Sequence, residues 1–196
     1  MLLLSPLELR EKYAVTRQCF HEIGEGSLFL MNKFSPLEDI ESVVPILSDI
    51  AIWGGVTEEQ CGKIFKRLET GIFKQGEHIF KKGDEPSHIY IVRKGKIGLV
   101  IIDQQINFLK KTLVTGECFG VASLMAMRIH TSTAVALEDS EVMALSRGAL
   151  WQLRHEDMEL FALLMMNIAR ELARRLKLTD DILLEYMQTH KDGESY

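Results

Sequence analysis

The residues best suited to chemistry lie close together in the stretch GECFGVASLMAMRIHTSTAVA, residues 116–136. A glycine turn is followed by a short run that favours a helix, then by a loop rich in hydroxyl groups, then by a strand. Main-chain N–H groups at the start of a helix attract anions, and hydroxyl groups add donors around the same point. The stretch therefore predicts a cradle for a phosphate or another small anion. Its candidate ligand-binding residues are Gly120, Val121, Ala122, Ser123, Arg128, His130, Thr131, Ser132 and Thr133.

Several of these side chains also have ordinary structural interpretations. Arg128 could turn inward to supply positive charge, but a solvated arginine in a loop between strands is the simpler interpretation. His130 fits either a phosphate contact or a neutral imidazole bonded to the backbone. The hydroxyl residues at 131–133 are also common at plain strand positions. The sequence leaves these alternatives open.

Other chemistries find no matching pattern. The histidines are scattered, so a metal site made of two neighbouring histidines and a carboxylate is not predicted. Cys19, Cys61 and Cys118 are odd in number and far apart, which fits small buried thiols better than disulfides or the four ligands of an iron–sulfur cluster. No P-loop or G-x-S-x-G motif is present. We therefore predict a non-enzymatic protein without a metal site. The histidines are His21, His78, His88, His130, His155 and His190.

Composition limits the class of protein. The 196 residues suit one sizeable domain with appendages, and 46% hydrophobic with 26% charged residues is typical of a globular protein. The net charge of −5 lacks the basic excess that holds a nucleic acid backbone. The N-terminus does not have the pattern of a signal peptide, and no run reaches the ~20 apolar residues of a membrane span. We expect a cytoplasmic protein that does not insert into membranes.

The candidate cradle lies within a region that predicts strands. From Phe73 to Ser146, short runs of isoleucine, valine, phenylalanine, tyrosine and leucine alternate with glycine or acidic turns. Regular short strands with turn signals between them favour an antiparallel sandwich or barrel over parallel strands with crossover helices. The predicted fold class is mainly β with flanking helices, in the form of a β-roll or jelly roll.

Helix signals precede the strands. The sequence SPLE at residues 5–8 and 35–38 combines a serine N-cap, a proline in the first turn and a glutamate that completes a capping box. We expect Pro45 to end or bend the second of these helices. Thr57 with Gln60 marks a third start, and Gly71 marks its end, which predicts an amphipathic helix of about four turns.

A long helix is predicted after the strands. Its apolar stripe extends over more than seven turns, with an interruption near residues 179–181. Such a face is larger than one small roll normally covers, so a second copy of the chain is the simplest partner. A helix folded back entirely on its own roll is the alternative. The stripe consists of Phe161, Met165, Ile168, Leu172, Leu176, Leu183 and Met187, with Glu171, Arg174, Arg175 and Lys177 on other faces.

The order of elements and the placement of glycines resemble a known family. LETGIFKQGEHIFKKGDEPSHIYIVRKGKIGLV, GECFGVASL and NIARELARRL together resemble the cyclic nucleotide-binding domain of catabolite-activator-type regulators, cyclic-nucleotide-dependent kinases and gated channels. The likeness covers roughly residues 50–180. Glycines at family turn positions are Gly76, Gly83, Gly95, Gly116 and Gly120. The resemblance implies a double-stranded β-helix of the cyclic nucleotide-binding type, with N-terminal helices and a long C-terminal helix.

The resemblance also assigns roles to the cradle. In the family, this stretch is the phosphate-binding cassette, with a glutamate that holds the ribose hydroxyl and an arginine that pairs with the phosphate. Aligned without gaps, the cassette glycine is Gly120, the glutamate position holds Val121 and the arginine position holds His130. Valine accepts no hydrogen bond, and histidine lacks the planar fork of arginine. The implied ligand is a cyclic nucleotide, cAMP or cGMP, at a degenerate cassette.

The helix signals and the resemblance together predict a division of the chain into parts. We expect an N-terminal helical extension over 1–49, the roll over 50–153, a long dimerisation helix over 154–190 and a tail over 191–196. The regulators of this family continue into a helix-turn-helix, which we do not find after Gln188, so we expect no DNA binding by this chain. The predicted function is that of a regulatory sensor domain. The competing prediction is a protein-interaction and dimerisation module that no longer binds a nucleotide.

Overall fold

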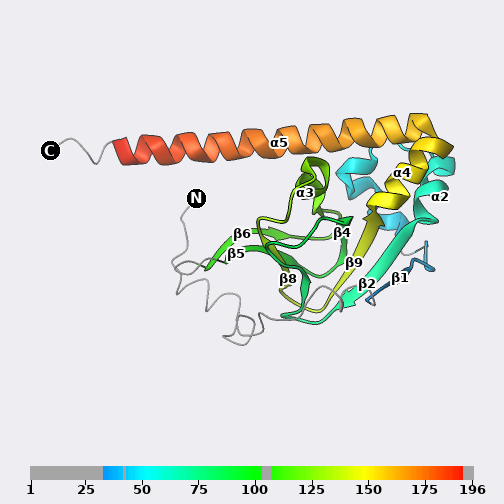
Figure 1. Ribbon diagram of the computed structural model, residues 1–196, viewed down its shortest axis with the longest axis horizontal. Helices are drawn as coiled ribbons and strands as arrows, with labels where there is room; N and C mark the ends of the chain where they lie inside the picture. Colours follow the sequence, from blue (N-terminus) through cyan, green and yellow to red (C-terminus); the bar gives the residue numbers. More distant parts are fainter. Residues whose placement is uncertain (1–32, 42, 103–106, 192–196) are drawn as a thin grey trace.

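The computed structural model describes residues 33–41, 43–102 and 107–191, and in these ranges the chain forms a roll of two antiparallel sheets with helices on one side (Figure 1). The five-stranded sheet has the order β1-β2-β9-β4-β7, and the four-stranded sheet has the order β3-β8-β5-β6. This architecture confirms the predicted fold class. The strands are β1 (Phe34–Pro36), β2 (Leu68–Phe73), β3 (His78–Phe80), β4 (His88–Lys94), β5 (Ile97–Ile102), β6 (Asn107–Leu113), β7 (Cys118–Phe119), β8 (Thr133–Ala136) and β9 (Ser140–Ser146).

The five-stranded sheet is covered on both faces, as β4 shows. Ile89 and Ile91 belong to a buried cluster that the sheet shares with the helices, whereas Tyr90 and Val92 belong to a second cluster inside the roll. Successive side chains of a strand point to opposite faces, so an unbroken apolar run is expected where both faces are buried. The sheet therefore separates the interior of the roll from a helical layer.

The helix α2 (Glu58–Phe65) begins where the sequence predicts. The Thr57 hydroxyl accepts a hydrogen bond from the Gln60 main-chain N–H at 3.3 Å, and the Gln60 side chain accepts one from the Thr57 N–H at 3.1 Å. The predicted length of four turns is wrong, because α2 has only 8 residues and Gly71 lies in β2. The chain leaves the helix early because β2 pairs along its whole length with β9.

The helix predicted to start at Ser35 is also wrong. The residues Phe34–Pro36 form the edge strand β1, in which Phe34 lies opposite Gly71 of β2. The Leu37 N–H then donates a hydrogen bond to the Leu68 carbonyl at 2.9 Å. Pairing with β2 supplies partners that an isolated helix start would have to find in a capping box, so tertiary contacts override the local signal.

Short 3-10 helices connect β1 to α2. The prediction that Pro45 ends or bends a helix is wrong. Pro45 lies at the start of η3 (Val44–Asp49), where a residue needs no N–H because the first N–H groups of a helix have no partner within it. The turn η4 (Ala51–Trp53) follows and carries the buried Ile52 and Trp53. The other predicted helix start, at residues 5–8, lies outside the described residues.

Two helices follow β9. α4 (Arg147–Glu156) is separated from α5 (Met158–Lys191) by Asp157, whose carboxylate accepts a hydrogen bond from the Leu160 N–H at 2.9 Å and so caps α5. The apolar stripe weakens at residues 179–181, but α5 continues through them. From residue 176 to residue 189 every position is exposed, and this part of α5 extends past the sheets (Figure 1). Among the described residues, no helix combines the length and the apolar character needed to cross a bilayer.

Candidate functional site

The predicted cassette begins at a sharp turn between β7 and the short helix α3 (Val121–Ala126). Gly120 sits at this turn with φ +77°, and a Cβ at this position would lie 2.9 Å from the His88 carbonyl oxygen and 2.9 Å from the Tyr90 ring. A left-handed conformation in so little space requires glycine. The turn brings the first main-chain amides of α3 to the end of β7, as the family resemblance implies.

The side chains at the start of α3 face in different directions. Val121 is 0% exposed and belongs to the cluster that the sheet shares with the helices, together with Leu124. Ala122 is exposed, and Ser123 is half-buried. The side chain of Val121 therefore contributes to the core, and polar contacts at this end of α3 come from the main chain and from Ser123.

The segment after α3 is hydrogen-bonded to the turn between β3 and β4. Arg128 is exposed, and its main-chain N–H donates to the Ser123 carbonyl at 3.1 Å. Thr131 is exposed and Ser132 is half-buried, whereas Thr133 is buried in β8 and accepts a hydrogen bond from the Lys82 N–H at 3.1 Å. The structure thus places the predicted site residues along one continuous segment, with Arg128 and Thr131 on its outer side.

His130 lies inside the protein. Its side chain is 3% exposed and stacks on Phe80, with ring centroids 3.7 Å apart and planes at 11°. Its main-chain N–H donates to the Asp84 carbonyl at 2.9 Å, and its own carbonyl accepts from the Gly83 N–H at 2.8 Å. Burial lowers the pKa of the His130 imidazole, although the nearby Asp84 carboxylate acts in the opposite direction.

The interior of the roll beside His130 is aromatic. Phe80 lies 5.6 Å from Tyr90 and 6.0 Å from Phe119 between ring centroids, and Tyr90 stacks on Phe119 at 5.2 Å. Because Phe119 directly precedes Gly120, this aromatic cluster lies next to the start of the cassette. The sequence marks these residues only as apolar strand positions, so their meeting under Gly120 was not predicted.

The buried state of His130 makes folding stability sensitive to acid. The His130 pKa is lower in the folded chain than in the unfolded chain. As the pH falls through the ordinary imidazole pKa of about 6.5, the unfolded chain therefore binds more protons than the folded chain. We expect the free energy of unfolding to decrease on acidification through that range, and to decrease less in His130→Phe, which retains an aromatic ring on Phe80. Urea denaturation at several pH values measures this difference. Equal acid sensitivity of His130→Phe and the wild type would contradict the prediction.

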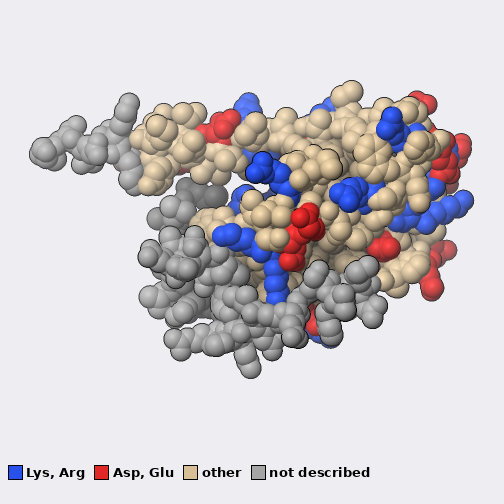
Figure 2. Space-filling view, in the orientation of Figure 1, with Lys and Arg blue, Asp and Glu red and all other residues tan. Residues whose placement is uncertain are grey.

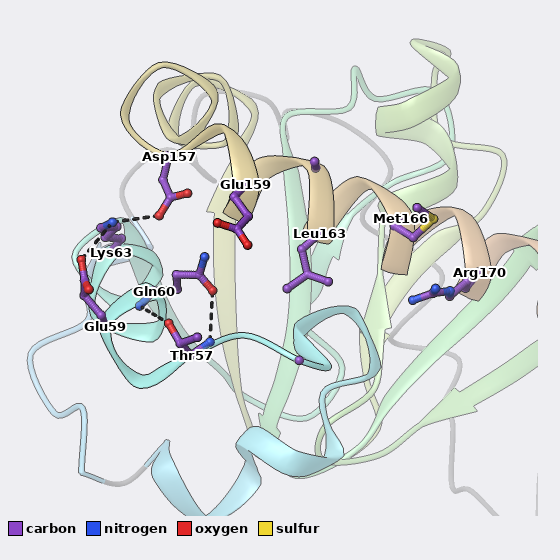
Figure 3. A pocket seen from close by; sticks show the side chains of 11 residues that line it. Thr57, Glu59, Gln60, Lys63, Asp157, Glu159, Leu163, Met166 and Arg170 are labelled. Atoms are coloured by element: carbon purple, nitrogen blue, oxygen red, sulfur yellow. Dashed lines mark hydrogen bonds and ion pairs between the residues drawn. The ribbon is translucent and has the colours of Figure 1, made fainter.

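A cavity of about 690 Å³ lies elsewhere, between α2 and the first turns of α5 (Figure 3). Lys63 bridges the Asp157 carboxylate at 2.8 Å and the Glu59 carboxylate at 3.3 Å on its wall. The pKa of Asp157 is lowered by the hydrogen bond from the Leu160 N–H and by Lys63. These charges hold α2 against the start of α5. The lining residues are Gly55, Thr57, Glu59, Gln60, Lys63, Asp157, Glu159, Ala162, Leu163, Met166 and Arg170, none of which belongs to the predicted cassette.

The sequence does not predict the contact between α5 and the strand that leads into the cassette. Arg175 was predicted to decorate a face of the long helix, but its guanidinium donates a hydrogen bond to the Cys118 carbonyl of β7 at 2.6 Å. Glu171 and Arg175 are spaced i, i+4 on the helix, and they form an ion pair at 2.7 Å. No sequence signal indicates that this turn of α5 crosses β7.

Metal ligands do not gather around the cassette. Within residues 33–41, 43–102 and 107–191, no three histidine, cysteine, aspartate or glutamate side chains lie together as candidate metal ligands. Cys61 and Cys118 are free thiols, half-buried and buried respectively, and burial raises the pKa of both. Cys19 lies outside the described residues. The chemistry of the site therefore consists of main-chain donors, hydroxyl groups and one buried imidazole.

Comparison with known proteins places this geometry in a family. Residues 71–157 match the model of the cyclic nucleotide-binding domain. The chain is 34% identical over 84 residues to the cAMP-dependent protein kinase regulatory subunit of Eremothecium gossypii, covering 43% of this chain and 18% of that protein. It is 30% identical over 132 residues to the cyclic AMP receptor protein of Thermus thermophilus, covering 66% of this chain and 58% of the relative. The chain thus spans less than two thirds of either relative.

Solved structures give the same result. The catabolite activator protein of Thermus thermophilus superposes with a TM-score of 0.62 at 29% identity, over 70% of this chain and 63% of that chain. A cyclic nucleotide-binding domain from Methylobacillus flagellatus superposes with a TM-score of 0.66 at 18% identity, over 74% of this chain and 83% of that chain, which shows the shared fold. Residues 71–157 of this chain belong to the cyclic nucleotide-binding domain family.

Proposed function

We propose that this chain is a non-enzymatic, cytoplasmic regulatory protein that senses a cyclic nucleotide at the cassette. The observation that carries the proposal is the family match over residues 71–157 together with the left-handed Gly120 at the start of α3. The roll over 50–153 holds the site, and the helix over 154–190 transmits its state. The relatives, a kinase regulatory subunit and a cAMP receptor protein, support a regulatory role. The proposed ligand-binding residues are Gly120, Val121, Ala122, Ser123, Arg128, His130, Thr131, Ser132 and Thr133.

We expect this cassette to bind a cyclic nucleotide more weakly than a cassette that has the family's glutamate and arginine. Val121 is buried in the core and offers no acceptor to a ribose hydroxyl, and His130 stacks on Phe80 instead of presenting a guanidinium. Each lost hydrogen bond to a charged group costs ~1.5–3 kcal/mol, so two losses weaken binding by roughly 10²–10⁴. Main-chain donors at the start of α3 and the hydroxyl of Ser123 remain. They would hold the anionic phosphate, the part of the ligand that all cyclic nucleotides share.

Calorimetric titration tests this proposal. cAMP and cGMP are titrated separately into the full chain. AMP, which lacks the cyclic phosphodiester, and inorganic phosphate, which lacks the nucleoside, are the matched control anions. We expect heat from at least one cyclic nucleotide and a weaker response to AMP. Heat from phosphate alone would identify a small-anion sensor. No heat from any of the four would support the competing function, an interaction module without a nucleotide.

We also propose that two copies of the chain associate through α5. Every residue from 176 to 189 is exposed, and this part of the helix carries Leu176, Leu183 and Met187 at 64%, 54% and 55% exposure. Figure 2 shows mainly uncharged side chains along this extension. Apolar surface of this extent on one helix indicates a protein partner, and a second copy provides the same surface in return. The negative net charge gives no support to DNA as the partner.

A charge on the exposed stripe should separate the copies. We expect Leu183→Glu to convert the wild-type dimer into monomer in sedimentation velocity, because a carboxylate would have to be desolvated in the interface at a cost of several kcal/mol. Gln188→Glu adds the same charge next to the stripe without removing an apolar side chain, and it should remain largely dimeric. A wild type that sediments as a monomer at all concentrations tested would refute the proposed association.

A further inference from the structure

A single side chain joins the end of the packed part of α5 to the strand that leads into the cassette. The Nη2 atom of Arg175 donates a hydrogen bond to the Cys118 carbonyl oxygen at 2.6 Å, and the same nitrogen lies 3.5 Å from the Cys118 sulfur. Arg175 is half-buried, whereas every residue from 176 to 189 is exposed. This hydrogen bond is therefore made at the point where α5 leaves the roll.

The guanidinium is held in place from its other side. Its Nε donates to the Glu171 carboxylate at 2.7 Å, one turn earlier in α5, and Arg174 donates to the second oxygen of the same carboxylate at 2.7 Å. The Glu171 side chain is only 15% exposed. Burial alone would raise the pKa of Glu171, but the hydrogen bonds from the two arginines outweigh it and lower the pKa. Glu171 thus stays ionised and fixes the direction in which Arg175 points.

The acceptor of this bond lies next to the cassette. Cys118 belongs to β7, a strand of only 2 residues that pairs with β4 at Ile91 and Tyr90. Gly120, the left-handed turn, follows two residues later and starts α3. A two-residue strand has few ladder hydrogen bonds of its own, so a charge-assisted bond to its carbonyl adds to what fixes its position. Phe119 is the one residue between Cys118, whose carbonyl Arg175 bonds, and the turn at Gly120.

We propose that Arg175 is the positioning residue that couples the cassette to the exposed part of α5. It makes no contact with ligand and acts through the Cys118 carbonyl. This inference rests on the proposed function, since it names how occupancy of the cassette reaches the helix. A ligand that prefers one position of Gly120 shifts the population in which the bond between Arg175 and Cys118 is made, and that population sets the direction in which α5 leaves the roll. By linkage, a change at Arg175 must also alter the cassette.

The matched variants are Arg175→Gln, Arg175→Lys and Arg174→Gln. Arg174 pairs with the same Glu171 carboxylate but is 61% exposed, so it controls for the loss of one charge and one ion pair. Lysine at 175 keeps the charge but cannot form the fork that bonds both Glu171 and Cys118. Without ligand, we expect Arg175→Gln to raise hydrogen exchange in the peptide covering 118–126 by about tenfold, the effect of losing one bond to a charged group. Arg174→Gln should stay close to the wild type, and Arg175→Lys should be intermediate.

The second measurement adds cAMP. In the wild type and in Arg174→Gln, a saturating concentration should change the exchange of the peptide covering 176–189, and in Arg175→Gln this response should be lost while heat of binding is still detected. An unaltered response in Arg175→Gln overturns the coupling. If the wild type gives no heat with cAMP, the proposed function fails, and the ligand-free experiment still decides the inference. Equal exchange of 118–126 in Arg175→Gln and Arg174→Gln then refutes it, whereas a selective increase supports it.

Discussion

Replacing Gly120 with alanine should lower the free energy of unfolding by about 2–5 kcal/mol. The left-handed conformation at φ +77° costs a residue with a Cβ ~1–2 kcal/mol, and overpacking costs a further ~1–3 kcal/mol. The overpacking arises because the new Cβ would lie 2.9 Å from both the His88 carbonyl oxygen and the Tyr90 ring. Neither neighbour yields easily, since His88 contributes main chain of β4 and the Tyr90 side chain is buried. Urea denaturation measures this loss as a shift of the midpoint, with the m-value of the variant equal to that of the wild type.

Gly83 provides the control for this prediction. It also has a positive φ, +97°, but a Cβ there would meet nothing within 4 Å. We expect Gly83→Ala to lose only the ~1–2 kcal/mol of the conformational term. Equal losses in the two variants would show that the space at Gly120 is larger than the structure indicates. A larger loss at Gly120 would confirm that β4 closes tightly on the cassette turn.

Restoring the family glutamate should be similarly costly. Val121 is 0% exposed and shares its buried cluster with Ile89 and Leu124. A carboxylate at this position, with no partner in the cluster, should lower the free energy of unfolding by about 3–5 kcal/mol. Denaturation of Val121→Glu gives the value, and Ala122→Glu is the matched control. Ala122 is the exposed next residue of α3, where an acid in the first turn is tolerated or slightly favourable.

The double variant Val121→Glu with His130→Arg separates two accounts of the cassette. If ligand can draw both side chains out of the core, cAMP should recover part of the lost stability in proportion to its affinity. If the aromatic cluster around Phe80 fills the space permanently, cAMP should give no thermal shift. A Val121→Glu variant as stable as Ala122→Glu would instead show that the side chain at 121 already reaches solvent.

The fold could be predicted from sequence where local signals and tertiary packing agree. Thr57 and Gln60 form the predicted capping box at the start of α2, where the tertiary structure also requires a helix. Ser35 carries an equally good start signal, yet the chain there is a strand, because pairing with β2 provides more hydrogen bonds than one helix cap. The strand region was predicted because its apolar runs are short and regularly broken by turns.

The site was predictable in position but not in orientation. Alignment of the family pattern assigns His130 to the arginine position, but only the packing of β3 and β8 shows that its ring stacks on Phe80. The contact between Arg175 and Cys118 joins residues 57 positions apart. It depends on which turn of α5 passes over β7, and helical periodicity carries no information about that.

The exposed end of α5 has a mechanical consequence. From Arg175 to Lys191 the helix continues for about 24 Å, at 1.5 Å per residue, and every residue from 176 to 189 is exposed. A stiff helix that is packed at its base amplifies small rotations there, so a tilt of about 10° at Arg175 would move the far tip by about 4 Å. An adjustment at the base that is too small to repack the roll would therefore displace the tip by about three quarters of the pitch of one helical turn.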